Sequence, residues 1–250
     1  MGDFMRLFRS KPKTWQMPSG EYYTIYKDML AQPHLLIAGA TGSGKSVVIN
    51  ALMYTALYGA PVDSAIGNQF ILIDPKRVEL VQYAALPHTI AYASEPGQFE
   101  PVLRSALALC DARYKVMQAA RTRKYGGSNV YIVIDEFADL MTTQKRVICP
   151  LIQRIAQIGR AARIHLIIAT QCPIKAVIPT EIKCNFDARM ALRTRSAQDS
   201  RNILGVSGCE RLPRYGEGYY MTPEGIQGYK IPMIPEEQLD ERVAWWMNQI

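Results

Sequence analysis

A glycine-rich turn between an apolar run and a helix-forming run constrains this chain more than any other feature. Residues 34–46 read HLLIAGATGSGKS, which matches a glycine, four free positions and then Gly-Lys-Ser. The apolar run predicts a buried strand, and the run that follows the turn predicts a helix. Glycines let a backbone approach a ligand closely, and loops of this kind bind phosphates at helix N-termini. The predicted nucleotide-binding residues are Gly39, Ala40, Thr41, Gly42, Ser43, Gly44, Lys45, Ser46 and Val47.

Two side chains of this loop have predicted roles of their own. Lys45 is a mobile positive charge that reaches the β- and γ-phosphates of a triphosphate. Ser46 is placed to ligate Mg²⁺. The alternative is a glycine-rich turn that binds nothing, and a chance match in a chain of this length has odds of roughly one in a hundred. ATP and Mg²⁺ are therefore the expected cofactors.

A second apolar run, VYIVI, ends in two adjacent carboxylates, Asp135 and Glu136. In a chain with a phosphate loop, this arrangement is called Walker B. Asp135 would hold the Mg²⁺ through water, and Glu136 would orient and polarise the water that attacks the γ-phosphate. Two carboxylates without a partner would be a costly end to a buried strand.

Two more predicted strands end in polar residues. The run IHLIIA leads into Thr170 and Gln171, a pair that can sense the γ-phosphate, although a simple strand cap is the alternative. The run FILI leads into Asp74 and Lys76, at the end of the strand where open α/β sheets bind ligands. Asp74 and Lys76 either lie near the site or form a turn with a solvated lysine.

The other periodic segments complete an α/β pattern. They predict helices over residues 96–124, 146–163 and 235–250, a short helix with Arg195 and Arg201, a strand around 186–192, and a hairpin of 218–221 with 229–231. Trp245 and Trp246 give the last helix an apolar face that packs back or meets a neighbour.

Composition adds bounds rather than a function. The 250 residues, with 48% hydrophobic content, suffice for one large α/β domain, which we expect, or two small ones. The net charge of +7 suits a polyanionic partner without requiring one. Five widely spaced cysteines predict ordinary thiols in a reducing, cytoplasmic setting. No apolar run approaches the ~20 residues that cross a bilayer. Residues 1–20 predict a basic arm that touches phosphates or a neighbouring subunit, or a solvated tail.

From about Met29 to Ile231 the chain resembles the motor domain of the FtsK/SpoIIIE family of DNA translocases. The motifs that carry the resemblance are the phosphate loop, IDPK at 73–76, LPH at 86–88, Arg113-Tyr114 with Met117, DEFADLM at 135–141, RAA at 160–162, IHL at 164–166, ATQ at 169–171 and DSR at 199–201. The resemblance implies a RecA-like ATPase with a central, mostly parallel sheet flanked by helices. It also implies a homohexameric ring around double-stranded DNA. We expect a lead-in arm over 1–28 and the motor domain over 29–250.

The resemblance also implies roles for single residues. Lys45, Glu136, Arg160 and Gln171 form the implied catalytic set, and Arg160 is similar to the arginine finger that reaches the nucleotide of the adjacent subunit. Thr170, Lys183 and Arg201 resemble residues that line the ring's channel and touch the DNA backbone. Two departures remove positive charge from that channel, Cys172 in place of arginine and Ala197 in place of lysine, so we expect Lys175, Arg193 or Arg195 to contribute there.

Three functions remain open at this point. The membrane segments and the winged-helix module of chromosome-segregating relatives are not in these residues, so we expect a motor of a phage, plasmid or integrative element. A second reading is an ATPase of a secretion system that acts on a protein. A third is a ring that docks a relaxase or a capsid portal and hydrolyses ATP slowly. For the motor of the first reading, a recombinase is a further expected partner.

Overall fold

The structure is a computed structural model that describes residues 24–58, 67–231 and 233–247. Most of the predicted arm, residues 1–23, lies outside this part of the chain, as do the side chains of Trp245 and Trp246. The described strands are β1 (His34–Ala38), β2 (Gln69–Ile73), β3 (Thr89–Ala93), β4 (Val130–Ile134), β5 (Ile164–Thr170), β6 (Ala188–Ala191), β7 (Glu217–Thr222) and β8 (Gly225–Lys230).

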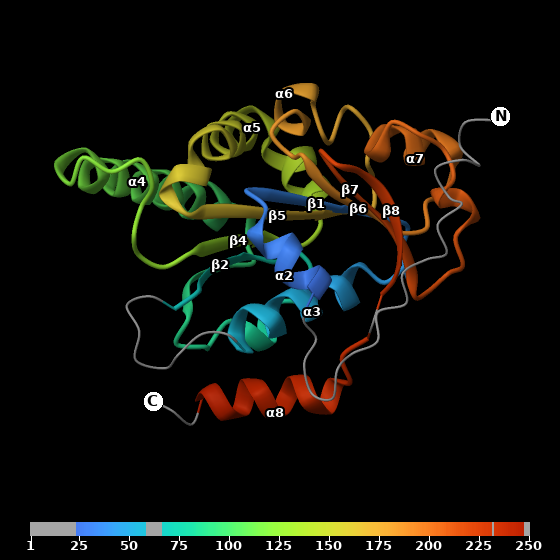
Figure 1. Ribbon diagram of the computed structural model, residues 1–250, viewed down its shortest axis with the longest axis horizontal. Helices are drawn as coiled ribbons and strands as arrows, with labels where there is room; N and C mark the ends of the chain where they lie inside the picture. Colours follow the sequence, from blue (N-terminus) through green and yellow to red (C-terminus); the bar gives the residue numbers. More distant parts are fainter. Residues whose placement is uncertain (1–23, 59–66, 232, 248–250) are drawn as a thin grey trace.

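Helices cover both faces of the sheet that these strands form (Figure 1). One face carries α4 (Pro96–Ala119), α5 (Phe137–Ala162) and α6 (Thr180–Lys183), and the other carries α2 (Thr24–Ala31), α3 (Lys45–Tyr58) and α8 (Glu236–Met247). Two 3-10 turns, η1 (Val81–Tyr83) and η2 (Cys209–Arg211), and the short helix α7 (Ala197–Leu204) complete the described elements.

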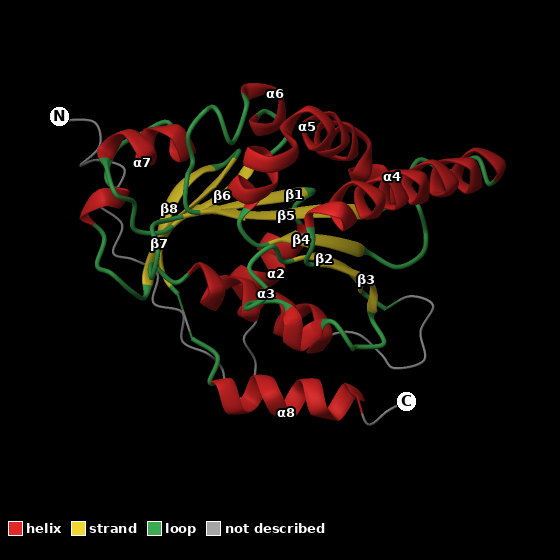
Figure 2. Ribbon diagram, turned by 180° about the vertical axis from the view of Figure 1, so that it is seen from behind, coloured by secondary structure: helices red, strands yellow, loops and turns green. Residues whose placement is uncertain are grey.

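The sheet has eight strands among the described residues, in the order β3-β2-β4-β5-β1-β6-β7-β8. Strands β1 to β6 are parallel, whereas β7 and β8 add an antiparallel hairpin at one side, as the sequence predicts (Figure 2). The parallel strands therefore share a carboxyl edge, at which they all end, and an amino edge, at which they all begin. Strands β1, β4 and β5, which carry the predicted site, are adjacent.

Alternating side chains divide the core into two layers, one on each face of the sheet. In β1, Leu35 and Ile37 pack with α3, whereas Leu36 packs with α4 and α5. The same alternation runs along β2, β4 and β5 because successive side chains of a strand point to opposite faces. A sheet covered on both faces explains why these strands appear in the sequence as continuous apolar runs.

Several predicted boundaries are wrong by a few residues. Helix α4 ends at Ala119 rather than at residue 124, since Arg121 adopts a left-handed backbone conformation, with φ of 52°, that a helix cannot continue through. Helix α5 begins at Phe137 rather than at residue 146, because it starts directly after the acidic pair and bends at Gln144. The sequence prediction missed β3, a side strand whose residues are mostly half-buried or exposed and show no clear apolar run. Arg195 precedes α7 instead of lying in it.

The predicted domain boundary after residue 28 falls inside α2. Tyr26 and Met29, one on each side of that boundary, are both buried in the core layer beneath α3. The packed domain therefore begins no later than Thr24, several residues before the point that the sequence motifs suggest.

Candidate nucleotide site

The phosphate loop connects β1 to α3 at the carboxyl edge, and its backbone has the shape of a phosphate cradle. A Cβ atom on Gly39 would lie 2.5 Å from Ser43 Oγ and 2.8 Å from Leu192 Cβ, so no side chain fits there. Gly42 has a φ of 69°, which favours glycine. Ser43 Oγ is buried without a hydrogen-bond partner among the described residues. An unpaired buried hydroxyl and a tight, left-handed backbone fit a loop that binds an external polar group.

Lys45, the first residue of α3, folds back over the loop. Its Nζ donates to the carbonyl oxygens of Gly39 and Ala40, at 2.9 and 3.1 Å. Burial lowers the pKa of Lys45 to about 8, against the opposing effects of the nearby Glu136 and Asp135 carboxylates. A phosphate group beside Nζ would favour the charged amine, so the lysine is suited to bind an anion at this point.

Asp135 and Glu136 follow β4 at the same edge and are both buried. Burial, followed by the charges of Glu79 and Asp74, raises the pKa of Asp135 to about 6. A divalent cation would offset the cost of that buried charge. Among the described residues no cluster of three or more His, Cys, Asp or Glu side chains could hold a metal by itself. Asp135 and Ser46 are the residues predicted to hold Mg²⁺, an ion that commonly keeps several waters and binds substrate phosphates.

Glu136 is held by donors from two neighbouring strand ends. Lys76 Nζ lies 3.0 Å from Glu136 Oε2, and the Thr170 hydroxyl donates to Glu136 Oε1 at 3.0 Å. The backbone N–H of Gln171 donates to the same oxygen at 3.1 Å. Glu136 itself has a φ of 62°, a conformation that a non-glycine residue rarely adopts and that is typical of functional sites. The carboxylate is thus oriented with high precision at the junction of β4 and α5.

Gln171 contacts both the phosphate loop and Glu136. Its side-chain carbonyl accepts a hydrogen bond from the hydroxyl of Thr41 in the phosphate loop, while its backbone holds Glu136. Thr41 and Gln171 thus link the phosphate loop to Glu136. The role of Gln171 as a sensor of the γ-phosphate stays a prediction.

The two residues that follow β2 have separate functions. Asp74 accepts hydrogen bonds from the backbone N–H groups of Arg77 and Leu80, both at 2.9 Å, so it shapes the turn. Lys76 is the residue that enters the site, through its contact with Glu136. The sequence placed Lys76 near the site but gave no sign of this ion pair, which joins side chains that are far apart along the chain.

The predicted DNA-contacting residues divide into two pairs. Thr170 is fully buried and its hydroxyl is bonded to Glu136, so in this conformation it presents no surface to a DNA backbone. Lys183 is half-buried and donates to the backbone carbonyl of Asn202, and burial lowers its pKa. Lys175 and Arg201 are exposed. Arg193 and Arg195, which we also expected to contribute to the channel, are exposed as well.

Arg160 lies at the other edge of the sheet. It belongs to the last turn of α5, the helix that begins beside Glu136 and leads back to the start of β5. Helix α5 thus begins at the carboxyl edge and ends at the amino edge, so Arg160 and the phosphate loop of its own chain lie at opposite edges of the sheet. Arg160 instead lines a cavity of about 860 Å³ at the amino edge, together with Arg123, Lys124 and Arg163.

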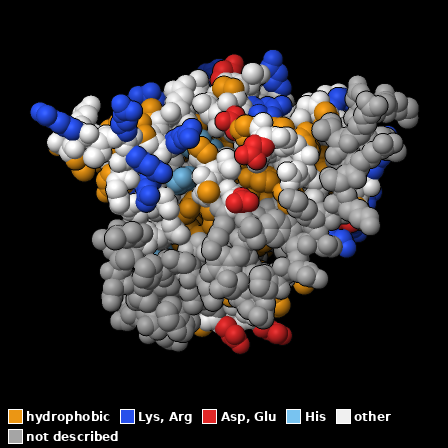
Figure 3. All heavy atoms as spheres, viewed as in Figure 1, with side chains coloured by type: hydrophobic (Ala, Val, Ile, Leu, Met, Phe, Trp, Pro, Cys, Tyr) orange, Lys and Arg blue, Asp and Glu red, His pale blue; other side chains and the backbone are white. Residues whose placement is uncertain are grey.

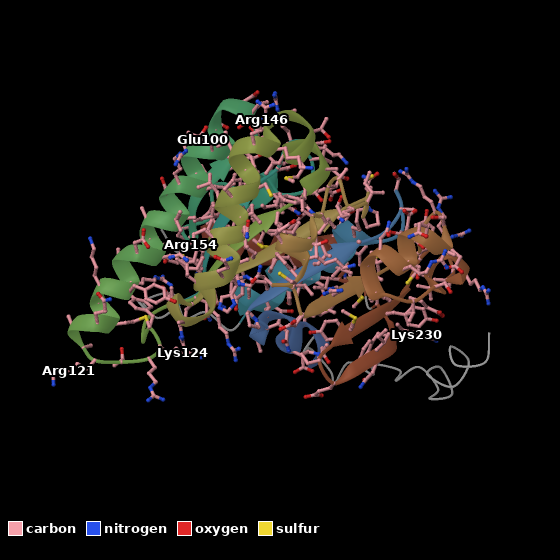
Figure 4. All side chains as sticks on the ribbon, turned by 90° about the horizontal axis from the view of Figure 1, so that it is seen from above. Glu100, Arg121, Lys124, Arg146, Arg154 and Lys230 are labelled. Atoms are coloured by element: carbon pink, nitrogen blue, oxygen red, sulfur yellow. The ribbon has the colours of Figure 1, made fainter. Side chains whose placement is uncertain are left out.

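The surface around this cavity is strongly basic. Figure 3 shows Lys and Arg side chains gathered on the side of the molecule where α4 ends. Figure 4 shows Arg121 and Lys124 at the projecting end of α4, and Arg154 near the place where α4 lies along α5. The amino edge therefore presents a cluster of cations, whereas the carboxyl edge carries the cradle and the acidic pair.

A family model supplies the deciding comparison. The model of the FtsK/SpoIIIE family matches residues 12–132 and 127–175, which is more than half of the chain. The chain belongs to the FtsK/SpoIIIE family. The resemblance stated from the motifs is thereby confirmed.

Curated relatives within the FtsK/SpoIIIE family agree with this assignment. A protein named DNA translocase FtsK from Chlorobaculum tepidum is 38% identical over 238 residues, covering 86% of this chain and 29% of the relative. A protein of the same name from Oceanobacillus iheyensis is 36% identical over 272 residues, covering 95% of this chain and 34% of the relative. The chain thus spans about a third of the length of these curated relatives.

Solved structures confirm the fold. The conjugation coupling protein TcpA of pCW3, solved with ATPγS, has a TM-score of 0.75 at 21% identity, over 86% of this chain and 65% of that one. The cytoplasmic domain of the type VII secretion ATPase EccC of Thermomonospora curvata has a TM-score of 0.72 at 24% identity, over 86% of this chain and 28% of that one. The predicted α/β class, with a central and mostly parallel sheet flanked by helices, is therefore confirmed. No described helix is long and apolar enough to cross a membrane.

Proposed function

We propose that this chain is the motor of an ATP-driven double-stranded DNA translocase that works as a homohexameric ring. Membership of the FtsK/SpoIIIE family supports the proposal, as do the curated relatives that are named DNA translocases. The observation that carries it is the separation of the phosphate loop from Arg160, which lie at opposite edges of one sheet. A second copy that turns its amino edge toward the carboxyl edge of the first would unite them.

In this proposal ATP binds to the loop of Gly39 to Val47, and Mg²⁺ is held by Ser46 and Asp135. When bound there, the ion would supply charge neutralisation to the phosphates. Glu136, fixed by Thr170 and Gln171, orients the attacking water and accepts its proton. The guanidinium of Arg160 from the adjacent copy stabilises the charge that develops on the γ-phosphate, so hydrolysis depends on assembly.

The DNA contacts follow from charge and exposure. The exposed candidates for phosphate contacts are Lys175, Arg193, Arg195 and Arg201, and the net charge of +7 favours a polyanion. Contacts to phosphates carry no direct sequence information, so the motor would move along DNA with little sequence preference. We also place this activity in the cytoplasm. The role in handling the DNA of a phage, plasmid or integrative element stays a prediction, because this chain spans only about a third of the length of its curated relatives.

The direct test is ATP hydrolysis by the purified chain with and without duplex DNA. Long duplex DNA at low salt should stimulate hydrolysis several-fold, and the stimulation should fall steeply as salt rises. Glu136→Gln is the control, because it should bind ATP without cleaving it. An equal rate with and without long duplex DNA at low salt would exclude the translocase.

A protein-directed ATPase is the second candidate. The observation that favours it is the loss of two expected cations, at Cys172 and Ala197, from the region of Lys175 and Arg201. The same assay separates the two functions: stimulation by a peptide signal but not by DNA would support the second. A docking ring for a relaxase or a portal would show slow hydrolysis with either addition.

A further inference from the structure

An arginine outside every motif of the resemblance lies over the phosphate loop. Arg214 belongs to the turn between η2 and β7. A Cβ atom built on Gly42 would lie 3.4 Å from Arg214 Nη2 and 3.7 Å from its Nε. The guanidinium group therefore contacts the middle of the cradle that should receive the phosphates. Residues 42 and 214 are distant in sequence, so only the fold brings them together.

The segment that follows β6 forms a wall along the same loop. The carbonyl oxygen of Arg193 accepts a hydrogen bond of 2.8 Å from the backbone N–H of Ala40. Leu192 packs against Gly39, and the positive charge of Arg195 acts on Lys45, whose pKa it helps to lower. The C-terminal part of the chain thus borders the phosphate loop at several points, and Arg214 is the part of this border that faces Gly42.

Arg214 is available to a ligand. It is exposed, and among the described residues no carboxylate pairs with it; its guanidinium lies 5.3 Å from the ring centre of the neighbouring Tyr215. Arg211, the last residue of η2 just before this turn, differs in this respect because it lies 3.6 Å from a carboxylate oxygen of Glu210. The exposed guanidinium lies beside Gly42, in the middle of the loop whose backbone N–H groups would bind the phosphates. A phosphate bound to this loop would therefore lie within reach of a second, cationic donor.

We propose that Arg214 binds a phosphate of the nucleotide held by the phosphate loop of its own chain. The planar guanidinium offers paired N–H donors that match two oxygens of one phosphate, which a lysine cannot do. This inference rests on the proposed nucleotide site. It adds a residue that acts within one subunit, in contrast to Arg160, and it makes the turn before β7 part of the binding site.

The experiment measures the affinity of the dilute chain for ATPγS with Mg²⁺ by calorimetry. Arg214→Ala should weaken binding about tenfold or more, the effect expected from losing a charge-assisted hydrogen bond. Arg214→Lys should recover part of that loss. Arg211→Ala removes an equal charge just before that turn and should bind as the unaltered chain does. Because Arg214 is exposed, the melting temperature of each variant should equal that of the unaltered chain.

Three outcomes would overturn the inference. Equal affinity of Arg214→Ala and the unaltered chain would remove Arg214 from the site while leaving the proposed function intact. The second outcome is restored ATPγS binding when Lys45→Ala chains are added to Arg214→Ala chains. The added chains have an intact Arg214 but cannot bind nucleotide in their own phosphate loop. Restored binding would therefore show that Arg214 contacts the nucleotide of a neighbouring subunit. Absence of ATPγS binding in the unaltered chain would instead defeat the proposed function itself, and this inference with it.

Discussion

At the scale of single residues, the site combines two buried charges with one strained backbone conformation. Asp135 is a buried carboxylate beside other acids, Lys45 is a buried amine that bonds to its own loop, and Glu136 is fixed in a left-handed conformation. Each of these arrangements costs stability in the free protein. The two buried charges become favourable once phosphates and a divalent cation are present, because each then has a partner of opposite sign. The same residues should therefore trade stability for binding.

Asp135→Asn tests this trade. The pKa of Asp135 is raised from 3.8 to about 6 in the folded chain, so the folded state binds this proton more tightly than the unfolded state does. Ionisation therefore lowers stability as pH rises from about 4 to about 6, and the loss persists above that range. Without Mg²⁺ or nucleotide, the variant should gain roughly 2 kcal/mol in free energy of unfolding at pH 8 and nothing at pH 4.

Urea denaturation of the variant and the unaltered chain at both pH values measures this difference. Loss of stability at pH 8 would show that the Asp135 carboxylate is favourably placed even without a ligand. The variant should also lose Mg²⁺-dependent ATP hydrolysis, so one substitution would raise stability and abolish activity.

The motifs predicted much of this site at the residue scale, because the loop and the acidic pair are contiguous in sequence. Lys45 lies close enough to Asp135 and Glu136 to feel their charges, and Gln171 contacts the loop through Thr41, whereas the roles of these residues stay predictions. The pairing of Lys76 with Glu136 could not be predicted from sequence, since it depends on which strands are neighbours in the sheet. The burial of Thr170 was missed for a similar reason: its hydroxyl bonds to a residue from an adjacent strand end.

At the scale of elements, α5 is the helix that separates Glu136 from Arg160, the two residues that the proposed reaction needs together. It begins beside the acidic pair, runs the depth of the sheet and ends at Arg160. Its last turn is pressed closely against β5: a Cβ atom on Gly159 would lie 2.4 Å from the backbone oxygen of Ile164 and 3.2 Å from His34 Cε1. The position of Arg160 is thus set by a glycine that permits this approach.

Gly159→Ala should disturb both the packing and the arginine beside it. Because the obstructing atom belongs to the backbone, the helix end must shift, and we expect a loss of about 1–3 kcal/mol in free energy of unfolding. Gly97→Ala is the matched control: Gly97 lies in the first turn of α4 with no atom within 4 Å of the added Cβ, so it should be neutral or slightly stabilising. Equal melting temperatures for Gly159→Ala and the unaltered chain would contradict this account of the α5 end.

Sequence periodicity predicted the buried strands and missed a strand that is more exposed. The buried strands β1, β2, β4 and β5 appear as apolar runs and were predicted, whereas β3, at the side of the sheet, has no such run. The start of α5 was placed too late because the local residues, DEFADLM, suggest a site rather than a helix. Helix ends that depend on a left-handed residue, as at Arg121, have no strong signal in a sequence without glycine at that point.

At the scale of the whole molecule, the two edges of the sheet are complementary. The carboxyl edge has the phosphate cradle and the acidic pair, and the amino edge has Arg160 in a basic cavity. In the proposed ring, copies stack edge to edge with a rotation that closes, and each site is completed by a neighbour. If Arg160 of one copy serves the phosphate loop of the next, hydrolysis should depend on the concentration of the chain.

The central claim is that ATP is hydrolysed between two copies of this chain, and mixing two inactive variants tests it most directly. Arg160→Ala should bind ATP normally and hydrolyse it poorly, and Glu136→Gln should bind ATP without cleaving it. A mixture forms some junctions in which an intact Glu136 faces an intact Arg160. The account predicts that the DNA-stimulated rate of the mixture exceeds the sum of the two separate rates; a mixture no faster than that sum would contradict it.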